Sequence, residues 1–192
     1  GEGGGQVLRT ALSLSCITGK PFEIFNIRKG REKPGLMPQH LMAVRSAQMI
    51  SEAIVEGAER GSTELKFSPD KISSRSISLD VGTAGSVVLI LQTIIPPLVL
   101  SSSPVEIILK GGTHVPFSPP FHYFQDVFLP MLPRMNMKVR ADIEGWGWYP
   151  EGGGMIKARI EPSELTPLRL DKRGELRKIR ILSAISNLPL HV

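Results

Sequence analysis

The amino-acid sequence predicts an α/β (α+β) fold with an internal duplication, in which each repeated unit packs two helices on one face of a mixed sheet. Three observations support this prediction. Glycine-rich loops stand directly before stretches whose apolar residues recur at helical spacing. Short apolar runs typical of strands follow these stretches. The same order of loop, helix and strand then recurs after about 80 residues, which indicates that one supersecondary unit has been repeated.

The first unit begins at the glycine-rich turn 1–6, which opens an apolar helix expected to end near Ile17. A second loop, 28–39, is basic and contains proline and glycine. A long helix follows it, because apolar residues there recur at the spacing of one helix face: Leu41, Val44, Ala47, Ile50 and Ile54. We expect the strands of this unit at 21–27, 54–58 and 63–68.

The second unit repeats this order. The loop 82–86, with the sequence GTAGS, opens the most apolar helix of the chain at 87–99, and the loop 111–120 opens another helix. One face of that last helix is predicted to be apolar and to consist of Phe121, Phe124, Val127, Phe128, Met131 and Leu132. The strands are expected at 105–110, 137–143 and 155–160, and the last two flank the loop 145–154.

The pattern changes after Pro162. Residues 168–185 predict a pair of strands around Gly174 that starts a different domain. We therefore divide the chain into a repeat-built domain, residues 1–166, and the start of an inserted domain, residues 167–192. The chain begins inside a glycine cluster without an initiator methionine and stops in mid-segment. We therefore expect a fragment that lacks a short N-terminal strand and a larger C-terminal portion.

The composition excludes several classes of protein. With 192 residues, 41% of them hydrophobic and 21% charged, the chain has the balance of a globular protein, not of a disordered, collagen-like or disulfide-stapled one. Its most apolar run, 87–100, is shorter than the roughly 20 residues of a membrane span, so we expect a core helix and no membrane partner. The single cysteine, Cys16, is predicted to be a buried thiol and favours a reducing compartment such as the cytoplasm. The net charge of +5 is compatible with nucleic acid or a phosphate-rich ligand.

The glycine-rich loops are candidate anion sites, since free N–H groups and the helix dipole attract negative charge and glycine lets a phosphate approach the backbone. In the first loop these positions include Gly4 and Gly5. Arg9 lies one turn into the apolar helix that follows, where its guanidinium must reach solvent or an anion. Glu2 precedes the same helix, and two interpretations stand for it: a cap at the positive end of the dipole, or a ligand of a metal ion.

The basic loop offers a second group of candidates. It holds four cations within six residues, Arg28, Lys29, Arg31 and Lys33. They are either solvated or, because guanidiniums in a rigid loop suit phosphates, a phosphate-binding group. Gln39 and His40 follow at the start of the next helix. Gln92 lies inside the most apolar helix, where a buried amide without a partner costs roughly 1–3 kcal/mol. It therefore faces a polar cleft or bonds to the backbone, and the cleft is favoured.

The sequence does not decide between a binding role and a packing role for the aromatic and histidine side chains of the second unit. His114 has a better claim to ligand contact than His122, for which packing or a surface position is expected. Trp146, Trp148 and Tyr149 either stack on bases or pack within a hairpin between two strands. The sequence contains no P-loop, no dinucleotide-binding motif and no zinc motif, and no Ser or Cys stands at a recognisable spacing from a histidine.

Six stretches together resemble the RNA 3'-terminal phosphate cyclase family, and they occur in order across nearly the whole chain: GEGGGQVLRTALSLSCITGKPF, IRKGREKPGLMPQHL, EGAERGSTELKF, GTAGSVVLILQTIIP, GGTHVPFSPPFHYF and GWYPEGGG. The acidic-then-glycine start and the RxGRxKPGLxxQH stretch are intact, so the chain resembles the catalytic cyclases more than the ribosome-assembly paralogues. The resemblance implies repeated units of two helices on a four-stranded sheet, interrupted by a smaller inserted domain. The duplication corresponds to the first two units.

The resemblance also implies an ATP-dependent reaction. The enzyme adenylates itself on a histidine and passes AMP to an RNA 3'-phosphate, giving an RNA(3')pp(5')A intermediate that closes to a 2',3'-cyclic phosphate. By matching positions, Arg9, Arg28 and Arg31 would bind phosphates of ATP or of the RNA end. Glu2 would hold a divalent metal ion, Mg2+ or Mn2+, or orient a phosphate. Four further positions are assigned to contacts with the nucleotide or the bound phosphate: Gln39, Gln92, Gly4 and Gly5.

The histidine that this family adenylates is expected beyond Val192, and none of the four histidines of this chain stands in its motif. Three functions therefore remain: the cyclase, a non-catalytic RNA-binding or ribosome-assembly protein of the same fold, and an enolpyruvyl-type transferase with a comparable repeated architecture. The expected partners of the cyclase are ATP and RNA with a 3'-terminal phosphate. The sequence leaves open the physiological RNA, the preferred metal and nucleotide, and whether the protein forms a homo-oligomer.

Overall fold

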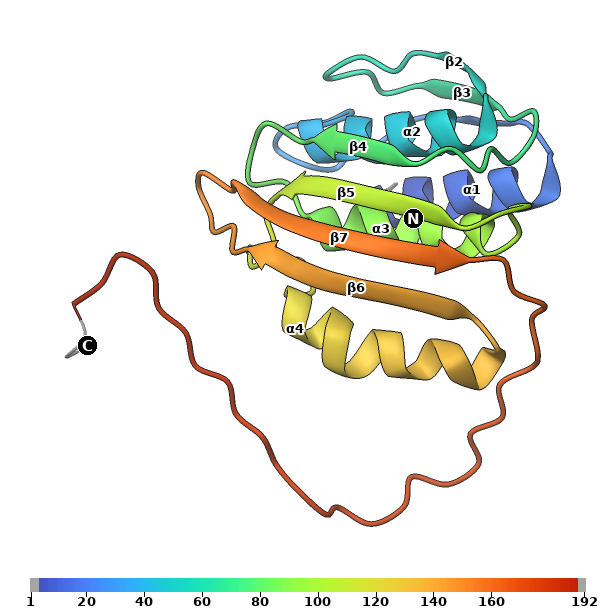
Figure 1. The fold of residues 1–192 in the computed structure, drawn as a ribbon. Helices are drawn as coiled ribbons and strands as arrows, with labels where there is room; N and C mark the ends of the chain where they lie inside the picture. Colours follow the sequence, from blue (N-terminus) through green and yellow to red (C-terminus); the bar gives the residue numbers. More distant parts are fainter. Residues whose placement is uncertain (1–3, 190–192) are drawn as a thin grey trace.

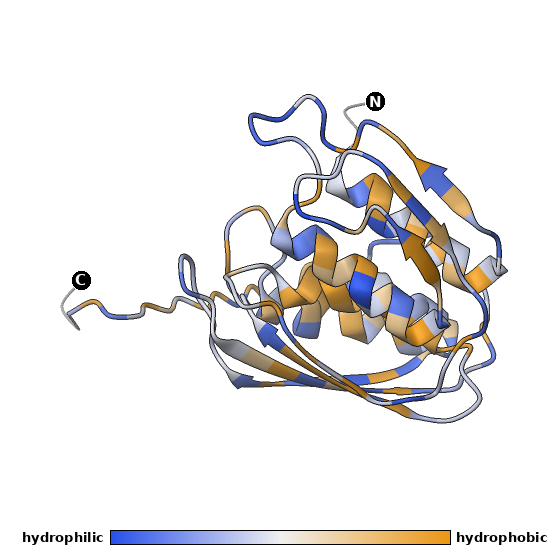
Figure 2. Cartoon of the chain, turned by 90° about the horizontal axis from the view of Figure 1, so that it is seen from above, coloured by the Kyte–Doolittle hydropathy of each residue, from blue (hydrophilic) through white to orange (hydrophobic). Residues whose placement is uncertain are grey.

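The computed structural model describes residues 4–189, which fold into two sheets with helices packed against them (Figure 1). The three longer helices contact one another and lie together on one side of the sheet layer. The opposite face of the larger sheet carries no helix of the described residues (Figure 2). In this part of the chain no helix is long and apolar enough to cross a membrane.

The first unit contains helices α1 (Gly5–Thr18) and α2 (Pro38–Ser51). Its three antiparallel strands have the order β1-β3-β2 and are β1 (Phe22–Ile24), β2 (Ile54–Glu56) and β3 (Leu65–Ser68). The helices bury their apolar faces against this sheet in one core cluster, which includes Leu8, Leu12, Val44, Ala47 and Phe67. Cys16 belongs to the same cluster, so the prediction of a buried thiol is confirmed.

The sheet of the second unit is mixed and has the order β4-β5-β7-β6. Strands β4 (Ile77–Asp80) and β5 (Val105–Gly111) are parallel. Strands β6 (Lys138–Gly145) and β7 (Gly154–Glu161) continue the sheet through antiparallel pairs. Buried and exposed side chains alternate along β5 and β7, because one face packs on helices and the other meets solvent.

Helix α3 (Val87–Leu98) is buried on nearly all sides, since it lies against the larger sheet and contacts both α1 and α2. The Ser86 side chain caps its start by accepting a hydrogen bond from the Leu89 N–H at 3.4 Å. Pro96 and Pro97 stand in its last turns. The apolar run 87–100 is therefore a core helix, as the sequence predicts.

The last helical segment is irregular. It starts as α4 (Phe121–Tyr123), continues as a π-helical turn at Phe124–Phe128 and ends as a 3-10 helix at Leu129–Met135. The prediction of one regular apolar face is wrong at Val127, which is 48% exposed. The wider π turn advances the chain by more than 3.6 residues per turn and so rotates the later side chains away from the expected face.

The first unit has the three strands that the sequence predicts among the described residues, and the second unit shows two helices on a four-stranded mixed sheet. Strand β4 was not predicted, because its four residues carry too little periodicity and become a strand only by pairing with β5.

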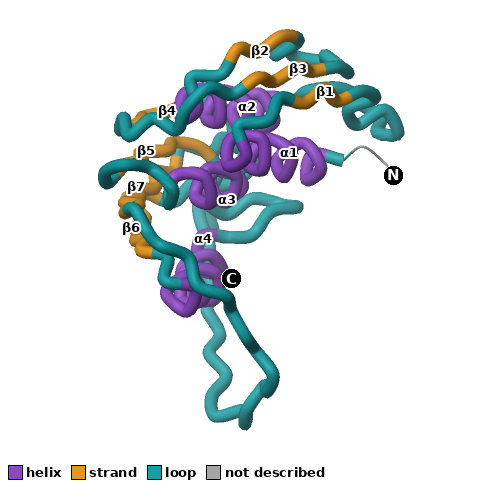
Figure 3. Tube along the Cα trace, turned by 90° about the vertical axis from the view of Figure 1, so that its right-hand side faces the viewer, coloured by secondary structure: helices purple, strands orange, loops and turns teal. Residues whose placement is uncertain are grey.

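The predicted strand pair around Gly174 is absent from the described residues. Residues 162–185 have no regular secondary structure, and the chain runs away from the body in an extended path (Figures 1 and 3). The Thr166 N–H donates to the Met135 carbonyl at 3.1 Å, and the side chains that follow are exposed. Two short strands without an apolar surface to cover them gain too little to form a hairpin. The division into two domains stays a prediction.

Candidate functional site

The N-terminus of α1 lies against the first turn of α2, and a glycine makes this approach possible. A Cβ atom on Gly5 would overlap the ring of His40, coming within 2.8 Å of its Cδ2 atom. The same Cβ would lie 3.2 Å from a guanidinium nitrogen of Arg9. A side chain at this position is therefore excluded. An imidazole and a guanidinium thus both lie against the first residue of α1, where a helix leaves N–H groups without a partner in the helix.

The basic loop between β1 and α2 is anchored so that it presents Arg28. The backbone of Arg28 is left-handed, with φ 54°, and its Nη1 atom donates to the Gly35 carbonyl at 2.9 Å. Gly35 packs directly on the Gly61 carbonyl, where a Cβ atom has no room. The Gly61 N–H donates to the Leu36 carbonyl at 2.8 Å. A guanidinium on such a fixed loop is suited to recognising a phosphate.

His40 is an uncharged hydrogen-bond donor between two cations. Its pKa is lowered to about 4, by burial first and then by the positive charges of Arg28 and Arg9. The Met37 N–H donates to its Nδ1 atom at 3.2 Å, so the neutral ring carries its proton on Nε2. The Nε2 atom faces Gly5 at the start of α1. An anion bound there would meet one neutral and two charged donors.

Sequence reasoning noted His40 but did not select it as a site residue. The signal available was its position, three residues into a helix that a basic loop opens. At that position a side chain can reach back to the N-cap backbone. What the sequence does not show is the contact with α1, because the two helix starts are more than thirty residues apart.

Arg9 also borders a groove between α1 and α3. Its Nη2 atom donates to Oε1 of Gln6 at 2.9 Å, and burial lowers its pKa. The groove has a volume of about 290 Å³, and its polar lining consists of Gln6, Arg9, Thr10, Ser13, Gln92 and Thr93. Gln92 is only half-buried here, which explains how the most apolar helix accommodates an amide without leaving it unsatisfied.

Gln39 connects this site to the second unit. A Cβ atom on Gly85 would lie 3.2 Å from the Cβ atom of Gln39, so the start of α2 touches the loop 82–86. That loop leads directly into α3, which carries Gln92. The two units therefore meet where the predicted polar residues lie.

The structure brings five of the predicted positions together at the starts of α1 and α2 and along the groove: Gly5, Arg9, Arg28, Gln39 and Gln92. Gly4 precedes α1 in an extended conformation with open space at its Cα atom. Arg31 is exposed in the same loop as Arg28, and its N–H donates to the Arg28 carbonyl at 3.0 Å. Glu2 lies outside the described residues. Within residues 4–189, no three His, Cys, Asp or Glu side chains gather in a way that could hold a metal ion.

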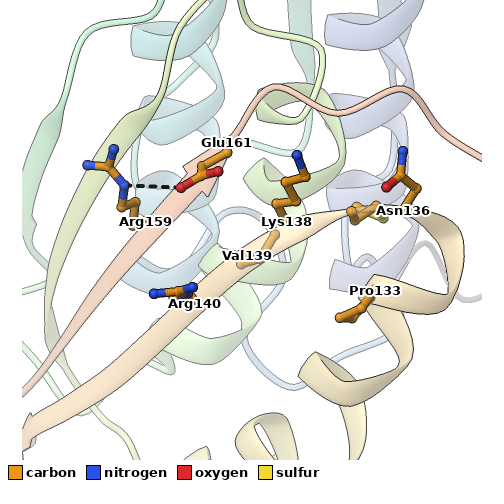
Figure 4. Close-up of a pocket in the computed structure, with 8 residues that line it drawn as sticks. Pro133, Asn136, Lys138, Val139, Arg140, Arg159 and Glu161 are labelled. Atoms are coloured by element: carbon orange, nitrogen blue, oxygen red, sulfur yellow. Dashed lines mark hydrogen bonds and ion pairs between the residues drawn. The ribbon is translucent and has the colours of Figure 1, made fainter.

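A second groove, of about 350 Å³, lies beside β6 and β7 and is not part of this site (Figure 4). It contains Lys138, Arg140, Arg159 and Glu161. Arg159 already pairs with Glu106 at 3.0 Å and with Glu161 at 3.5 Å. None of the predicted site residues lines this groove.

Fold and site together define an α/β protein of repeated units, with guanidiniums clustered at the start of a glycine-led helix. A model of the RNA 3'-terminal phosphate cyclase family matches residues 1–190. The chain therefore belongs to the RNA 3'-terminal phosphate cyclase family.

Curated relatives support this assignment across bacteria and archaea. The chain is 47% identical over 193 residues to the RNA 3'-terminal phosphate cyclase of Koribacter versatilis, covering 100% of this chain and 54% of that protein. It is 46% identical over 194 residues to the protein of the same name from Caldivirga maquilingensis, covering 100% of this chain and 55% of that protein. The chain thus spans about half the length of the curated relatives it matches.

Proposed function

We propose that the complete protein is an ATP-dependent RNA 3'-phosphate cyclase and that this chain supplies its phosphate-binding site. One observation carries the proposal: the His40 ring from α2 and the Arg9 guanidinium from α1 both lie against Gly5 at the start of α1, and the charge of Arg28 is near enough to lower the pKa of His40. Hydrogen-bond donors from two separate segments, α1 and the loop and helix start at 28–40, thus lie around the start of α1. Binding of a polyanion requires several donors at one place. The name shared by the relatives supports an RNA end as substrate.

The proposed reaction has three steps. A histidine nitrogen attacks the α-phosphorus of ATP and displaces pyrophosphate. An oxygen of the RNA 3'-phosphate then attacks the same phosphorus, which frees the histidine and gives RNA(3')pp(5')A. Finally the vicinal 2'-OH attacks the 3'-phosphorus, loses its proton and displaces AMP, which leaves a 2',3'-cyclic phosphate. Adenylation serves to convert a poor leaving oxygen into AMP.

In this proposal the residues of the chain bind and orient phosphates. Arg9 and Arg28 neutralise phosphate oxygens, and their effect is largest on the charge that develops as phosphorus is attacked. The Nε2–H of His40 donates to the same oxygens without adding charge. Gln39 and Gln92 bond to the nucleotide or the bound phosphate, and the N–H groups beside Gly4 and Gly5 complete the cradle. Arg31, in the same loop as Arg28, contacts a phosphate farther out.

The nucleophilic histidine and the metal ion are proposed on the family resemblance. We place the adenylated histidine beyond Val192. A divalent ion, Mg2+ or Mn2+, would neutralise phosphate charge with Glu2 as a ligand. The described residues offer no complete ligand set of their own. The buried Cys16 thiol fits a reducing compartment, and we propose the cytoplasm.

Labelled ATP tests this function in the complete gene product. We expect acid-labile, alkali-stable transfer of AMP to the protein, and conversion of an RNA 3'-phosphate to a form that phosphatase no longer removes. Binding of RNA without either reaction would overturn the cyclase in favour of the non-catalytic RNA-binding protein. Stabilisation by phosphoenolpyruvate but not by ATP would instead identify an enolpyruvyl-type transferase.

A further inference from the structure

Two loops of the second unit gather ring side chains at one end of the larger sheet. The loop 111–120 contributes His114, and the loop 145–154 contributes Trp146 and Trp148. The His114 ring stacks on Trp146 with a centroid distance of 4.3 Å and an interplanar angle of 7°. Trp148 stacks with both of these rings, at 5.3 Å from His114 and 5.5 Å from Trp146. The three rings therefore form one stacked cluster.

Hydrogen bonds hold this cluster in place. Oγ1 of Thr113 and Nδ1 of His114 are 2.8 Å apart, and Nε2 of His114 lies 2.8 Å from Nδ1 of His122. The Gly147 N–H donates to the same Thr113 oxygen at 2.8 Å and ties the two loops together. Burial, and then the charge of His122, lower the pKa of His114 to about 4, so its ring is neutral near pH 7. The stack is ordered and uncharged before any ligand arrives.

The outer rings of this region are exposed. Trp146 is 40% exposed and Tyr149 70% exposed. Phe117, three residues after His114, is fully exposed and has a left-handed backbone with φ 60°. A phenylalanine in that conformation costs conformational energy and here gains no burial, so it contributes nothing to folding stability. Its ring is therefore open to contact with a ligand.

This region adjoins the candidate functional site. A Cβ atom on Gly152 would lie 2.6 Å from the Thr83 carbonyl oxygen and 2.9 Å from the Cα atom of Ala84. The loop 145–154 thus packs on the loop 82–86, whose Gly85 touches Gln39 at the start of α2. In Figure 1 these loops lie at the end of the sheet where β4 and β5 stop and β7 begins.

We propose that Phe117, Trp146 and Tyr149 form a stacking surface for bases of single-stranded RNA, next to the site that holds the 3'-phosphate. This proposal rests on the function proposed above. Aromatic rings stack on every kind of base, so such a surface holds a strand without selecting its sequence. Three exposed rings at separate positions suit successive bases of a strand, whereas the adenine of ATP occupies a single stack.

Three variants of the complete gene product test the surface: Phe117→Gly, Trp146→Ala and Tyr149→Ala. The probe is a single-stranded RNA with a 3'-phosphate and a fluorescent 2-aminopurine near that end, and its Kd is measured alongside the Kd of ATP. We expect each variant to weaken RNA binding by about tenfold, as stacking on one base allows, and to leave ATP binding unchanged. Phe117→Gly is the most informative variant, because glycine readily adopts the left-handed backbone and the fold is retained. A change in RNA binding then reports the loss of the ring alone.

Matched controls separate stacking from general damage. Trp146→Phe and Tyr149→Phe keep a ring and should keep the affinity for RNA. Ile54→Ala removes an exposed apolar side chain, 74% exposed, from β2 in the other sheet and should leave RNA binding unchanged. Thermal unfolding of every variant shows whether the fold persists.

The outcomes distinguish this proposal from the proposed function. If the protein cyclises RNA and the three ring-removing variants bind RNA as the wild type does, the stacking surface is overturned and the cyclase stands. A loss confined to ATP binding assigns the rings to the adenine and also overturns it. If wild-type protein shows no cyclisation but binds RNA in a ring-dependent way, the surface is supported and the cyclase is overturned.

Discussion

The two units have similar chain paths but present opposite chemistry. In the first unit, the loop that leads into α2 is cationic, and its Arg28 donates to the Gly35 carbonyl and lies near enough to His40 to lower the pKa of that ring. In the second unit, the corresponding loop 111–120 contains no lysine or arginine and presents His114 and Phe117. The fold thus fixes where these loops lie, while their side chains decide what they can bind. The cationic loop suits the phosphates proposed as ligands of the first unit, and the aromatic loop suits the flat, uncharged bases proposed for the second.

The two histidines show the same contrast at the level of single groups. His40 and His114 both have a pKa lowered to about 4, and burial is the largest cause for each. For His40 the remaining causes are Arg28 and Arg9, whereas for His114 the remaining cause is His122. The first histidine belongs to a cationic site, and the second belongs to a ring cluster.

The largest effect is expected from Arg28→Ala, which removes a guanidinium from the cationic loop of the first unit. Adenylate formation should fall by about 10²- to 10³-fold, because a donor to the developing phosphate charge is lost. The fold should persist, since only the bond to the Gly35 carbonyl disappears, at a cost of about 1 kcal/mol. The measurement is the rate of AMP transfer from labelled ATP.

A control variant and a second measurement show whether the effect of Arg28→Ala is specific. Lys29→Ala removes an exposed cation from the same loop and should have a small effect on the rate. In Arg28→Ala the pKa of His40 should rise, because a nearby positive charge no longer opposes protonation; NMR titration of the ring shows this. If the variant is labelled with AMP at the wild-type rate, Arg28 is not part of the phosphate-binding site.

Gly5→Ala should reduce ATP affinity by about tenfold or more, because its Cβ atom would displace the His40 ring. Alanine normally stabilises a helix relative to glycine by about 1 kcal/mol, so a lowered Tm would show that the clash dominates. Gly4→Ala is the control for stability, since its Cβ atom meets nothing within 4 Å and the Tm should not change. Equal Tm and equal ATP affinity in Gly5→Ala would contradict the close approach of α1 and α2.

Thr113→Val tests the ring cluster of the second unit. Thr113 is 1% exposed, and its oxygen accepts the Gly147 N–H, so valine would leave a buried donor unsatisfied. The free energy of unfolding should fall by about 1–3 kcal/mol, measured by urea denaturation. Thr63→Val, at an exposed position between β2 and β3, should change it by less than about 0.5 kcal/mol. Equal losses in the two variants would show that the bond between the loops is dispensable.

The smallest effect is a pH dependence shared by the two units. In the unfolded chain His40 and His114 titrate near 6.5, whereas in the folded protein their pKa is about 4. Between these values the unfolded state binds more protons, so the free energy of unfolding should decrease as the pH falls from 6.5 to 4 and be independent of these groups above 6.5. His40→Gln and His114→Gln should each flatten the profile, and the double variant should flatten it additively. A double variant with the wild-type slope would refute both shifts.

The sequence predicted the elements with strong periodicity and missed those that depend on partners. The helices α1 and α3 lie within a residue or two of their expected bounds, because a long apolar stripe and glycine or proline at the ends are local signals. Helix α2 ends earlier, at Ser51, so the prediction that Ile54 belongs to its apolar face is wrong: Ile54 begins β2 and is 74% exposed. Strand β4 was missed, and a strand pair was wrongly expected around Gly174. Both errors concern short strands, whose formation depends on a neighbouring strand or an apolar surface.

By itself the sequence determined the repeated α/β plan and the family, through periodicity and through motifs that occur in order along the chain. It also marked Arg9 and Gln92, because each is polar within an apolar helix, and Arg28, because it is one of four cations in a short loop. Only the tertiary structure decided that His40 is a neutral donor between two guanidiniums and that Phe117 remains in solvent. Burial and charge at a side chain arise from segments distant in sequence, and no local pattern records which segments meet.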